Sequence, residues 1–483
     1  MKKGVQIAKG ILAIIVILGV CSCAVNPVTG KQELMLLSES EEIKLGGQTD
    51  AQVVSEYGIY KDEKLTAHLA EICRRVGKTS HRPNLSYHFK ILDASVVNAF
   101  AVPGGYVYFT RGILASLNSE AELAGVMGHE VGHITARHSA QQYSRAQLAQ
   151  IGLMGLALGL PEELSSLAGV AQFGVGMLFL RFSRDNERQA DDLGVEYSAK
   201  VGYDPSQMAN FFLTLERMNP SSDRTGLPEW FSTHPNPENR VAAVRARAKE
   251  WQAKLGLKDT VVNQEAYLRQ IDGLVFGDDP RQGYVEGGIF YHPELRLQFP
   301  VPKNWNLNNT QSNVQIISEG KDAVILFTLA KGTSPGEAAK AFATQNKAQV
   351  IKSEPLQVNG LPAERLVSNV QAKTGMTRVM SCFIQRGKEI FVFHGLASQS
   401  LFQKYEAVFH QTMQQFKELS DPRKMDVKPE RVRIRTTRSA DTLENSLRSF
   451  GIPEKRLKEM TLLNGRSLND VVPAQTLIKV VEK

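Results

Sequence analysis

His129, Glu130 and His133 form a His-Glu-x-x-His pattern. On a helix, positions i and i+4 lie on one face about one turn apart, so both imidazoles can bind the same metal ion. Glu130 projects about 100° away from His129, which lets it act on a water molecule at the metal without being a ligand. Zinc-assisted peptide hydrolysis requires two neutral nitrogen ligands, an open coordination position and an adjacent carboxylate base. The alternative interpretation is a surface helix that carries two histidines.

The pattern lies in a segment that predicts a buried helix beginning at Glu120. Ser119 and Glu122 have the spacing of a capping box. His138 lies about 140° around the same helix from His133, so it is predicted to point away from the metal. The apolar face of the helix consists of Leu123, Val126, Met127 and Ile134.

A third ligand is expected on a second helix. An extended motif would place a histidine at Ser139, and Ala136 replaces the glycine that would turn the chain. Glu187 and Asp191 are again an i, i+4 pair, on a helix predicted to end near Gly202. One carboxylate can bind zinc while the other accepts a hydrogen bond from a ligand histidine. We expect Glu187 to be the ligand and Asp191 the hydrogen-bond partner. Without the preceding His-Glu-x-x-His helix, such an acidic pair would be interpreted as part of a solvent-exposed helix face.

These motifs together resemble the zinc gluzincins of the HtpX and CAAX prenyl protease family. Residues 98–114 and the Ser-Thr-His-Pro stretch at 232–235, followed by Asn239-Arg240, are similar to its soluble periplasmic branch of beta-barrel assembly-enhancing proteases. The resemblance covers roughly residues 26–255; beyond residue 258 there is no helix repeat with a period of about 34 residues. It implies a zinc metalloendopeptidase with one Zn²⁺ per chain, held by His129, His133 and Glu187, with Glu130 as catalytic base.

A predicted strand follows a Gly-Gly turn in the first matching stretch. The run from Tyr106 to Thr110 is β-branched and aromatic, which is typical of a strand. In the family resembled, this strand lies beside the zinc cleft and can pair with an extended substrate. The residues expected to contact substrate are then Gly104, Gly105, Tyr106, Val107 and Tyr108. The alternative is an ordinary strand of a sheet.

The loop residue His234 is a second candidate for the site. Pro235 follows it, so its backbone is predicted to be extended. Its imidazole can enter the cleft, either to donate to the developing oxyanion or to occupy the open metal position in a resting state. The alternative is a loop histidine without a catalytic part. For Arg240, a structural salt bridge is at least as well favoured as an electrophilic role.

The N-terminal residues predict a lipoprotein signal. Three lysines precede a short apolar run at residues 11–20, which is too short to span a bilayer as a mature anchor. The stretch 20–23 resembles a bacterial lipobox, with cleavage after residue 22 and lipidation of Cys23. Ala24 after this cysteine implies, by resemblance to known sorting patterns, the outer membrane of a diderm bacterium. A cleaved soluble secretory protein is the alternative.

Charge and cysteine usage exclude some functions. The formal net charge of +7 falls to +4 without residues 1–22, and the segment 421–438 alone carries +4. The rest is about neutral, so nucleic acid is not expected as a partner. Cys73 and Cys382 fall in different predicted domains, so we do not expect a disulfide between them.

The fold class predicted is multidomain: a mainly α-helical zincin-type catalytic domain with a small sheet, an α+β module and a small C-terminal module. Two apolar stretches, 151–160 and 167–180, are predicted to pack in the catalytic core, with a mobile lid as the alternative. The predicted parts are a signal peptide (1–22), a zinc metallopeptidase domain (23–258), a helical linker (259–286), a PsbP-like α+β domain (287–419), a basic linker (420–438) and a LysM-like module (439–483).

The function predicted is a periplasm-facing, outer-membrane-tethered zinc endopeptidase that cleaves misfolded or unassembled envelope proteins. The segment 439–483 resembles a module type that can bind peptidoglycan, although a retained structural role is favoured because Ala440 stands where a glycine is usual. The alternative is a chaperone or envelope-assembly factor with an occluded zinc site. Glu130 favours the enzyme, because metal binding alone would not require it.

Overall fold

The computed structural model describes residues 23–157, 182–218, 230–235, 239–372 and 375–483. They form two compact units. The first, here called the catalytic unit, contains the residues up to Val54, Gly58–Gly277 and Glu430–Lys483; the second contains Ser55–Tyr57 and Asp278–Pro429. The stretch 167–180, the signal segment 1–22 and part of the stretch 151–160 lie outside the described residues.

The catalytic unit is mainly helical, as predicted, and is built around α5 (Glu120–Thr135), whose residues are all buried. Ser119 caps α5 by accepting from the Glu122 amide, but the Glu122 carboxylate accepts from the Asn118 amide instead of completing a capping box. The other helices of this unit are α2 (Glu39–Tyr57), α3 (Glu63–Thr79), α4 (Arg111–Ser116), α6 (His138–Ala157), α8 (Arg184–Lys200), α9 (Met208–Met218), α10 (Trp230–Thr233), α11 (Arg240–Leu255) and α12 (Gln264–Gln270), with a 3-10 turn at Pro205–Gln207.

Glycines let α8 cross directly against α5. A Cβ at Gly128 would lie 2.9 Å from the carbonyl oxygen of Gly194, and a Cβ at Gly194 would lie 3.0 Å from the amide of His129. Such distances are too short for ordinary side chains, so the two backbones touch only because these positions carry no Cβ. The contact places the first turns of α8 opposite the His-Glu-x-x-His segment.

The small sheet of the catalytic unit consists of β3 (His88–Leu92), β4 (Ala99–Val102) and β5 (Tyr106–Thr110), in the order β3-β5-β4. The predicted strand is therefore present, but it is the central one. It pairs in parallel with β3 and antiparallel with β4 along its length. Both edges of β5 are already hydrogen-bonded, so its backbone cannot pair with an extended substrate as predicted. Contact of Gly104, Gly105, Tyr106, Val107 and Tyr108 with substrate stays a prediction.

The two glycines before β5 have a structural role instead. Gly104 and Gly105 have positive φ angles of 80° and 97° in the turn that joins β4 to β5. A Cβ at Gly105 would lie 2.1 Å from the carbonyl oxygen of Ser86. These positions require glycine for the turn itself.

A short N-terminal hairpin packs on the far end of α5. It consists of β1 (Cys23–Val25) and β2 (Gln32–Leu34), which are antiparallel. The buried side chain of Asn26 donates to the carbonyl of Ala136, 3.2 Å away, at the C-terminal end of α5. Gln141 of α6 donates to the same carbonyl over 2.9 Å.

The C-terminal segment is part of the catalytic unit and begins earlier than predicted. Residues 430–436, assigned to a basic linker, form a strand that pairs with both β21 and β6, because Val432 alternates with the arginines and is buried. The elements are β6 (Val275–Phe276), β18 (Glu430–Thr436), β19 (Asp441–Thr442), α16 (Leu443–Ser449), a 3-10 turn (Glu454–Arg456), α17 (Leu457–Asn464), β20 (Val471–Val472) and β21 (Leu477–Glu482). The LysM likeness stays a prediction.

The second unit has an α+β fold around a seven-stranded antiparallel sheet in the order β10-β11-β12-β16-β15-β14-β13, with a smaller sheet in the order β17-β9-β8-β7. Aromatic side chains, among them Phe299, Phe327 and Phe393, fill its core. Its strands are β7 (Tyr284–Glu286), β8 (Ile289–His292), β9 (Leu297–Pro300), β10 (Asn306–Asn309), β11 (Val314–Ile317), β12 (Ala323–Ala330), β13 (Gln349–Val358), β14 (Leu361–Ala372), β15 (Gly375–Arg386), β16 (Glu389–Ser398) and β17 (Lys417–Glu418). Its helices are α13 (Pro335–Gln345), α14 (Phe402–Gln414) and α15 (Pro422–Met425), with a 3-10 turn at Pro280–Gln282.

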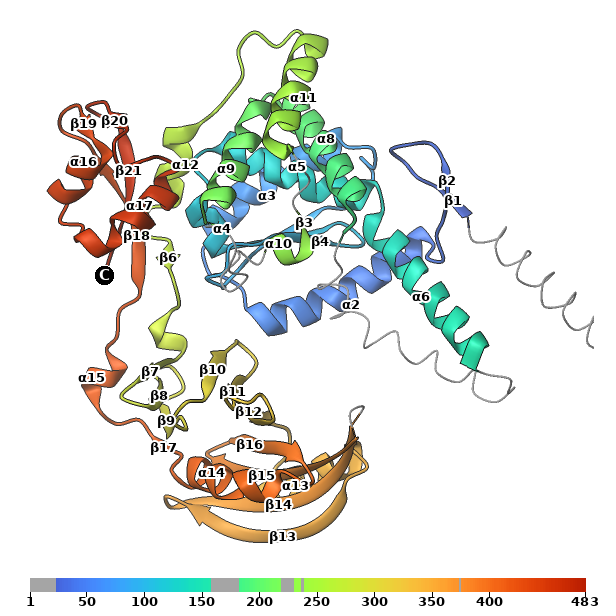
Figure 1. The fold of residues 1–483 in the computed structure, drawn as a ribbon, viewed down its shortest axis with the longest axis vertical. Helices are drawn as coiled ribbons and strands as arrows, with labels where there is room; N and C mark the ends of the chain where they lie inside the picture. The colour runs from blue at the N-terminus through green and yellow to red at the C-terminus, as the bar shows by residue number, and fades with distance from the viewer. Residues whose placement is uncertain (1–22, 158–181, 219–229, 236–238, 373–374) are drawn as a thin grey trace, which may run out of the picture. The chain divides into compact units, whose positions relative to one another are not determined.

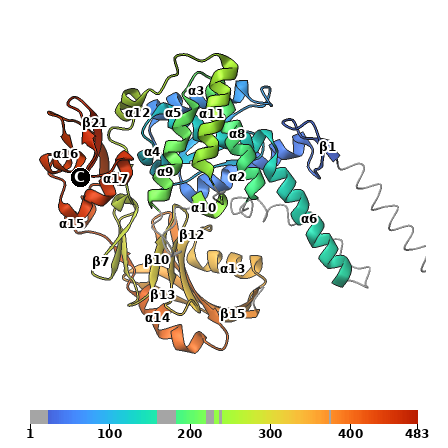
Figure 2. The same cartoon turned by 45° about the horizontal axis from the view of Figure 1, so that its top comes forward.

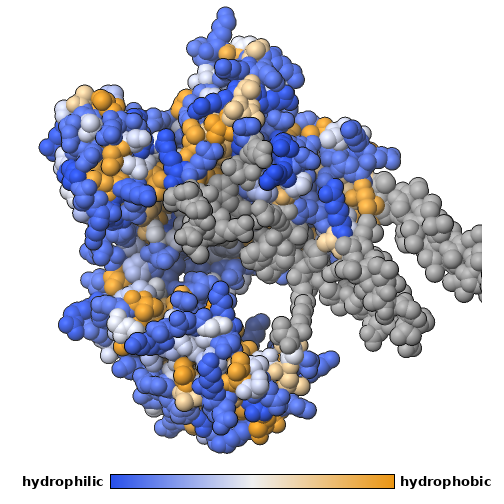
Figure 3. All heavy atoms as spheres, viewed as in Figure 1, coloured by the Kyte–Doolittle hydropathy of each residue, from blue (hydrophilic) through white to orange (hydrophobic). Residues whose placement is uncertain are grey.

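The described surface is mostly hydrophilic on one face (Figure 3), and the described cysteines outside the N-terminal segment are buried. On the face shown in Figure 3, hydrophilic residues predominate and hydrophobic ones occur in small groups. None of the helices within the described ranges combines the length and the apolar character needed to cross a membrane. Cys73 and Cys382 are both buried and free, and they lie in different units.

Candidate metal centre

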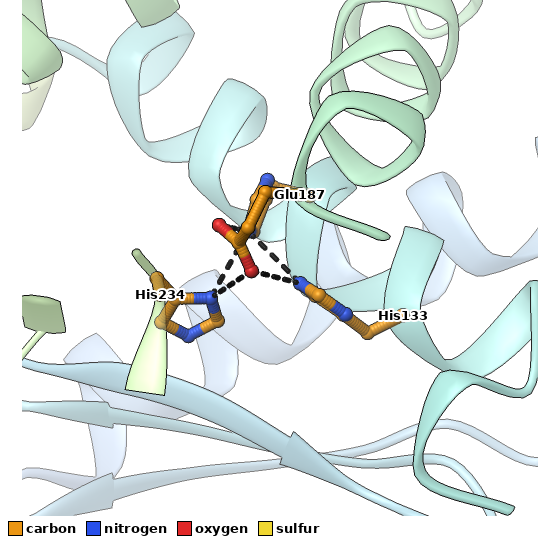
Figure 4. Close-up of side chains that lie close together, drawn as sticks. His133, Glu187 and His234 are labelled. Carbon is orange, nitrogen blue, oxygen red and sulfur yellow. Dashed lines mark hydrogen bonds and ion pairs between the residues drawn. The ribbon is translucent and has the colours of Figure 1, made fainter. Parts of the chain in front are cut away.

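The crossing of α5 and α8 brings four possible ligands together. One ligand atom from each of His129, His133, Glu187 and His234 lies within 4.8 Å of the others. Figure 4 shows the Glu187 carboxylate between the imidazoles of His133 and His234. The two histidines of the motif come from α5, Glu187 comes from the first turn of α8, and His234 follows the short helix α10. All four side chains are at most 1 % exposed.

The spacing of these atoms fits a tetrahedral zinc ion. Zinc–ligand bonds of about 2.0–2.1 Å require neighbouring ligand atoms to be about 3.3 Å apart. The Nε2 atoms of His129 and His133 are 3.1 Å apart, and Glu187 Oε1 lies 3.4 Å from His133 Nε2. His234 Nδ1 lies 3.1 Å from Glu187 Oε1 and 3.4 Å from His129 Nε2. Nitrogen and carboxylate donors at this spacing are the set that zinc prefers.

A carboxylate fixes the orientation of the first histidine. His129 Nδ1 lies 2.9 Å from Asp191 Oδ1, so its N–H donates there and leaves Nε2 with a lone pair for a metal. Arg240 donates to both oxygens of Asp191, over 2.7 and 2.8 Å. Burial raises the pKa of Asp191 to about 6 against the opposing charge of Arg240. Asp191 therefore lies where it was expected, and Arg240 makes the predicted structural salt bridge.

His138 holds the second histidine, which corrects the prediction that it points away. Its Nδ1 lies 2.9 Å from His133 Nδ1, and its Nε2 lies 2.8 Å from Gln189 Oε1. Because the Gln189 oxygen only accepts, His138 carries its proton on Nε2, and its Nδ1 accepts from His133. The Nε2 of His133 is then free to bind a metal.

The extrapolation for His138 failed because α5 ends before it. Arg137 has a positive φ of 56°, and a new helix starts at His138. Arg137 is held in this conformation by an ion pair of 2.9 Å with the buried Glu42, which Arg82 also contacts over 3.1 Å. The turn therefore occurs without the glycine that an extended motif would use, and the sequence around it contains no local signal for it.

Glu130 is a buried acid that is not used by the ligand cluster. Neither of its carboxylate oxygens makes a hydrogen bond of normal geometry within the described part of the chain. Burial raises the pKa of Glu130 to about 7, and the charge of His234 only partly offsets this rise. Its Oε1 lies 3.7 Å from His234 Nε2, so the carboxylate lies beside the cluster. A buried carboxylate without a hydrogen bond of normal geometry in this position is suited to accept a proton from a molecule that enters the site.

His234 is packed in place by its own short helix. Its amide donates to the carbonyl of Trp230 over 2.8 Å, and the two rings stack with centroids 4.2 Å apart. Burial opposes a charge on His234, but the nearby carboxylates of Glu187 and Glu130 outweigh burial and raise its pKa. The helical turn of α10 was not predicted from the sequence, and the next described helix, α11, starts at Arg240.

The chain matches a known peptidase family in this region. Residues 63–248 match the model of peptidase family M48. The chain is 30% identical over 232 residues to the beta-barrel assembly-enhancing protease of Escherichia coli strain K12, covering 46% of this chain and 47% of that protein. It is 28% identical over 239 residues to the mitochondrial metalloendopeptidase OMA1 of Schizosaccharomyces pombe, covering 48% of this chain and 68% of that protein.

These matches confirm the resemblance drawn from the sequence: residues 63–248 match the model of peptidase family M48, and the two relatives are named as a protease and a metalloendopeptidase. The chain spans about half the length of the beta-barrel assembly-enhancing proteases that it matches. Among solved structures, the cyanobacterial PsbP of Synechocystis aligns with 28% of this chain at 11% identity and a TM-score of 0.24. That likeness is too weak to carry an argument, so the PsbP-like assignment stays a prediction.

We expect Glu187→Ala to lower the affinity for zinc by more than about 100-fold, because removing even a hydrogen-bond partner of a ligand costs about 10–100-fold. Metal content after dialysis against a chelator, measured by mass spectrometry, provides the test. The control is Glu196→Ala on the same helix, whose carboxylate pairs with Lys200 and does not face the cluster. Full zinc retention by Glu187→Ala would show that the ligand is assigned wrongly.

Proposed function

We propose that this chain is a zinc-dependent endopeptidase of the bacterial envelope that hydrolyses misfolded or unassembled periplasmic or outer-membrane proteins. The observation that carries this proposal is the buried carboxylate of Glu130, which makes no hydrogen bond of normal geometry within the described residues, beside four converging ligand groups. A purely structural zinc site has no use for such an acid, because burying a carboxylate costs free energy. The matches to beta-barrel assembly-enhancing proteases support the envelope as the location.

In the proposed mechanism, His129, His133 and Glu187 hold one Zn²⁺. When bound, zinc supplies Lewis acidity, which polarises the scissile carbonyl and acidifies the attacking water. Glu130 takes the proton of the attacking water on its carboxylate and passes it to the leaving amine. Asp191 keeps the proton of His129 on Nδ1, and His138 does the same for His133, so both ligand nitrogens face the site.

His234 is proposed to close the site in a resting state. Its Nδ1 completes the set of four ligand atoms, so the imidazole would occupy the fourth position at a bound zinc. This position supports the hypothesis that His234 occupies the open metal position in a resting state, rather than the hypothesis that it stabilises the oxyanion. A substrate must then displace His234 together with the stacked Trp230.

The second candidate function is a chaperone or assembly factor whose zinc site rarely cleaves. One observation favours it: the side chains of His129, His133, Glu187, Glu130 and His234 are at most 1 % exposed. A closed site of this kind fits both a regulated protease and a non-catalytic protein. The two functions differ in whether Glu130 matters for turnover.

Substrate is proposed to bind at the edge of β4, in place of the strand predicted from the sequence. In the small sheet, β4 pairs with β5 on one side only. Its Ala101 backbone lies close enough to Glu130 to favour the charged carboxylate. An extended peptide that pairs with β4 would therefore pass along the catalytic side of the sheet.

The chain is proposed to be tethered to the outer membrane through a lipid on Cys23, with the catalytic unit in the periplasm. The support is the lipobox-like stretch before Cys23. Binding of peptidoglycan by residues 439–483 is the weaker part of this proposal, because the buried apolar residues of this segment pack into the core of the catalytic unit.

Glu130→Gln is expected to retain zinc and lose proteolysis by at least about 100-fold, because the amide cannot accept the proton of water. Digestion of casein and of an unfolded outer-membrane protein, with zinc content measured on the same samples, tests this. The control is Glu196→Gln, because the Glu196 carboxylate pairs with Lys200 away from the cluster. Glu120→Gln is not suitable, since the Glu120 carboxylate accepts hydrogen bonds from Tyr203 and Asn263. Equal inactivity of wild type and Glu130→Gln across substrates and pH would favour the chaperone.

His234→Ala is expected to raise basal cleavage, because it removes the side chain that closes the cluster. The rates of peptide cleavage by wild type, His234→Ala and His234→Ala/Glu130→Gln are compared, and the double variant should be inert. A fall in turnover by roughly 10²–10³-fold would assign His234 to oxyanion stabilisation instead. Unchanged kinetics with unchanged zinc affinity would remove it from the mechanism.

Metabolic labelling with a palmitate analogue is expected to mark the wild type and Cys21→Ser, but not Cys23→Ser. The physical reason is that the thiol of Cys23 is the proposed attachment point of the lipid. Labelling of Cys23→Ser with loss of label in Cys21→Ser would move the lipid to Cys21. No label in any form would support a soluble secretory protein.

A further inference from the structure

Lys479 is a buried charge in the last strand of the chain. It lies in β21 between Ile478 and Val480, and its side chain has no exposed surface. Its ammonium donates to the carbonyls of Ala115 over 2.7 Å and Leu117 over 2.9 Å. A buried ammonium is strongly unfavourable unless its N–H groups donate hydrogen bonds. An apolar side chain would therefore be the ordinary residue at this position of the strand.

The two carbonyls lie where the chain passes from α4 into α5. Ala115 belongs to the last turn of α4 and Leu117 caps its C-terminal end, where carbonyl groups lack partners within the helix. A cation at this end is also favoured by the helix dipole. Two residues after Leu117, Ser119 starts the helix that carries the metal ligands.

A buried acid on α5 faces the same region. Glu122, in the first turn of α5, is 5 % exposed, and its carboxylate accepts from the amide of Asn118 over 2.8 Å. Burial raises the pKa of Glu122 to about 7 and lowers the pKa of Lys479 to about 7, and the attraction between the two groups only partly offsets both shifts. Glu122 holds the amide of Asn118 from the α5 side of the turn. Lys479 holds the carbonyls of Ala115 and Leu117 from the α4 side.

The strand that carries Lys479 is itself fixed. The side chain of Asn464, at the end of α17, accepts from the Lys479 amide and donates to its carbonyl, both over 2.8 Å. The helix α17 lies against α4, and the apolar residues of this module belong to the same core as those of α3, α5 and α9.

The other end of α4 is held through the same module. Arg111, at the start of α4, donates to the carbonyls of Val275 and Gly277 around β6. Strand β6 in turn pairs with β18 of the C-terminal module. A helix of six residues, which would be marginal alone, is thus fixed at both ends.

We propose that the C-terminal module (Glu430–Lys483) is a positioning element of the peptidase site, and that Lys479 is the positioning residue that fixes the start of α5 through the carbonyls of Ala115 and Leu117. This inference rests on the proposed function for its catalytic readout, and goes beyond it by giving the module a role other than glycan binding. Lys479 acts through the helix and touches neither substrate nor metal.

The test uses the full-length protein with zinc and the variant Lys479→Met, which keeps the aliphatic stem and removes the ammonium. The rate of backbone amide hydrogen exchange is expected to rise by roughly 10–100-fold in residues 115–124. The reason is that the hydrogen bonds donated by the charged ammonium are lost. Exchange in α11 and in β15 and β16 should stay unchanged. Lys458→Met, at an exposed lysine of α17, is the matched control and should change neither region.

Kinetics separates positioning from general stability. For Lys479→Met we expect kcat to fall about tenfold with KM within about twofold, because Glu130 and the two histidines of α5 shift relative to Glu187 of α8 while the substrate edge does not move. Glu122→Gln, a milder change that keeps the shape of the site, should give a smaller loss in kcat and a smaller rise in exchange confined to the same residues. It stays informative if Lys479→Met fails to fold.

The outcomes are distinct. An even rise in exchange over the whole catalytic unit, or no rise in residues 115–124 for either variant, would overturn the proposal. So would a change in KM alone. If the wild type shows no proteolysis, the proposed function fails, but the exchange pattern still decides whether Lys479 fixes the start of α5.

Discussion

The direct contact between α5 and α8 is the constraint on which the metal centre depends. Glu187 and Asp191 lie on a helix that must approach the motif helix closely enough for carboxylates to reach imidazoles. The glycines at 128 and 194 allow this approach, since a side chain at either would meet backbone atoms at about the closest distance that real contacts show. Once the helices are this close, the i, i+4 spacing on each one determines which side chains meet: His129 and His133 from α5, Glu187 and Asp191 from α8.

The same contact brings many charged side chains into a buried region, where most of them pair with groups of opposite charge. Arg240 compensates Asp191 through two hydrogen bonds, and Glu187 lies between histidines that hold its pKa well below the usual range despite its burial. Glu130 alone lacks such a hydrogen-bonded partner within the described residues. Retaining a polar group in this costly state is typical of catalytic residues, because the partner is supplied by the reacting molecules.

The sequence predicted the features that depend on local rules. The motif spacing, the cap at Ser119 and the pair Glu187 and Asp191 follow from helical geometry, so both helices were placed correctly. The errors arise where tertiary contacts decide. His138 was misplaced because the turn at Arg137 depends on Glu42, which is 95 residues away in the chain. The strand 106–110 was found, but its central place in the sheet depends on β3 and β4 and cannot be read from its own residues. The strand at 430–436 was predicted as a basic linker because of its arginines. The alternation of apolar residues with these arginines, which is typical of a strand, was given too little weight.

The two ends of α5 are held by segments from opposite ends of the described chain. The N-terminal hairpin reaches the carbonyl of Ala136 through Asn26, and Lys479 reaches the carbonyls before Ser119 from the last strand. Close packing around α5 restricts its movement along its own axis, and the hydrogen bonds at its two ends, which are directional, add to that restriction. Because Glu130 and the two histidines share this one helix, a shift of α5 along its axis would move all three relative to Glu187. The polar contacts at both ends therefore act together with the core packing to keep base and ligands aligned.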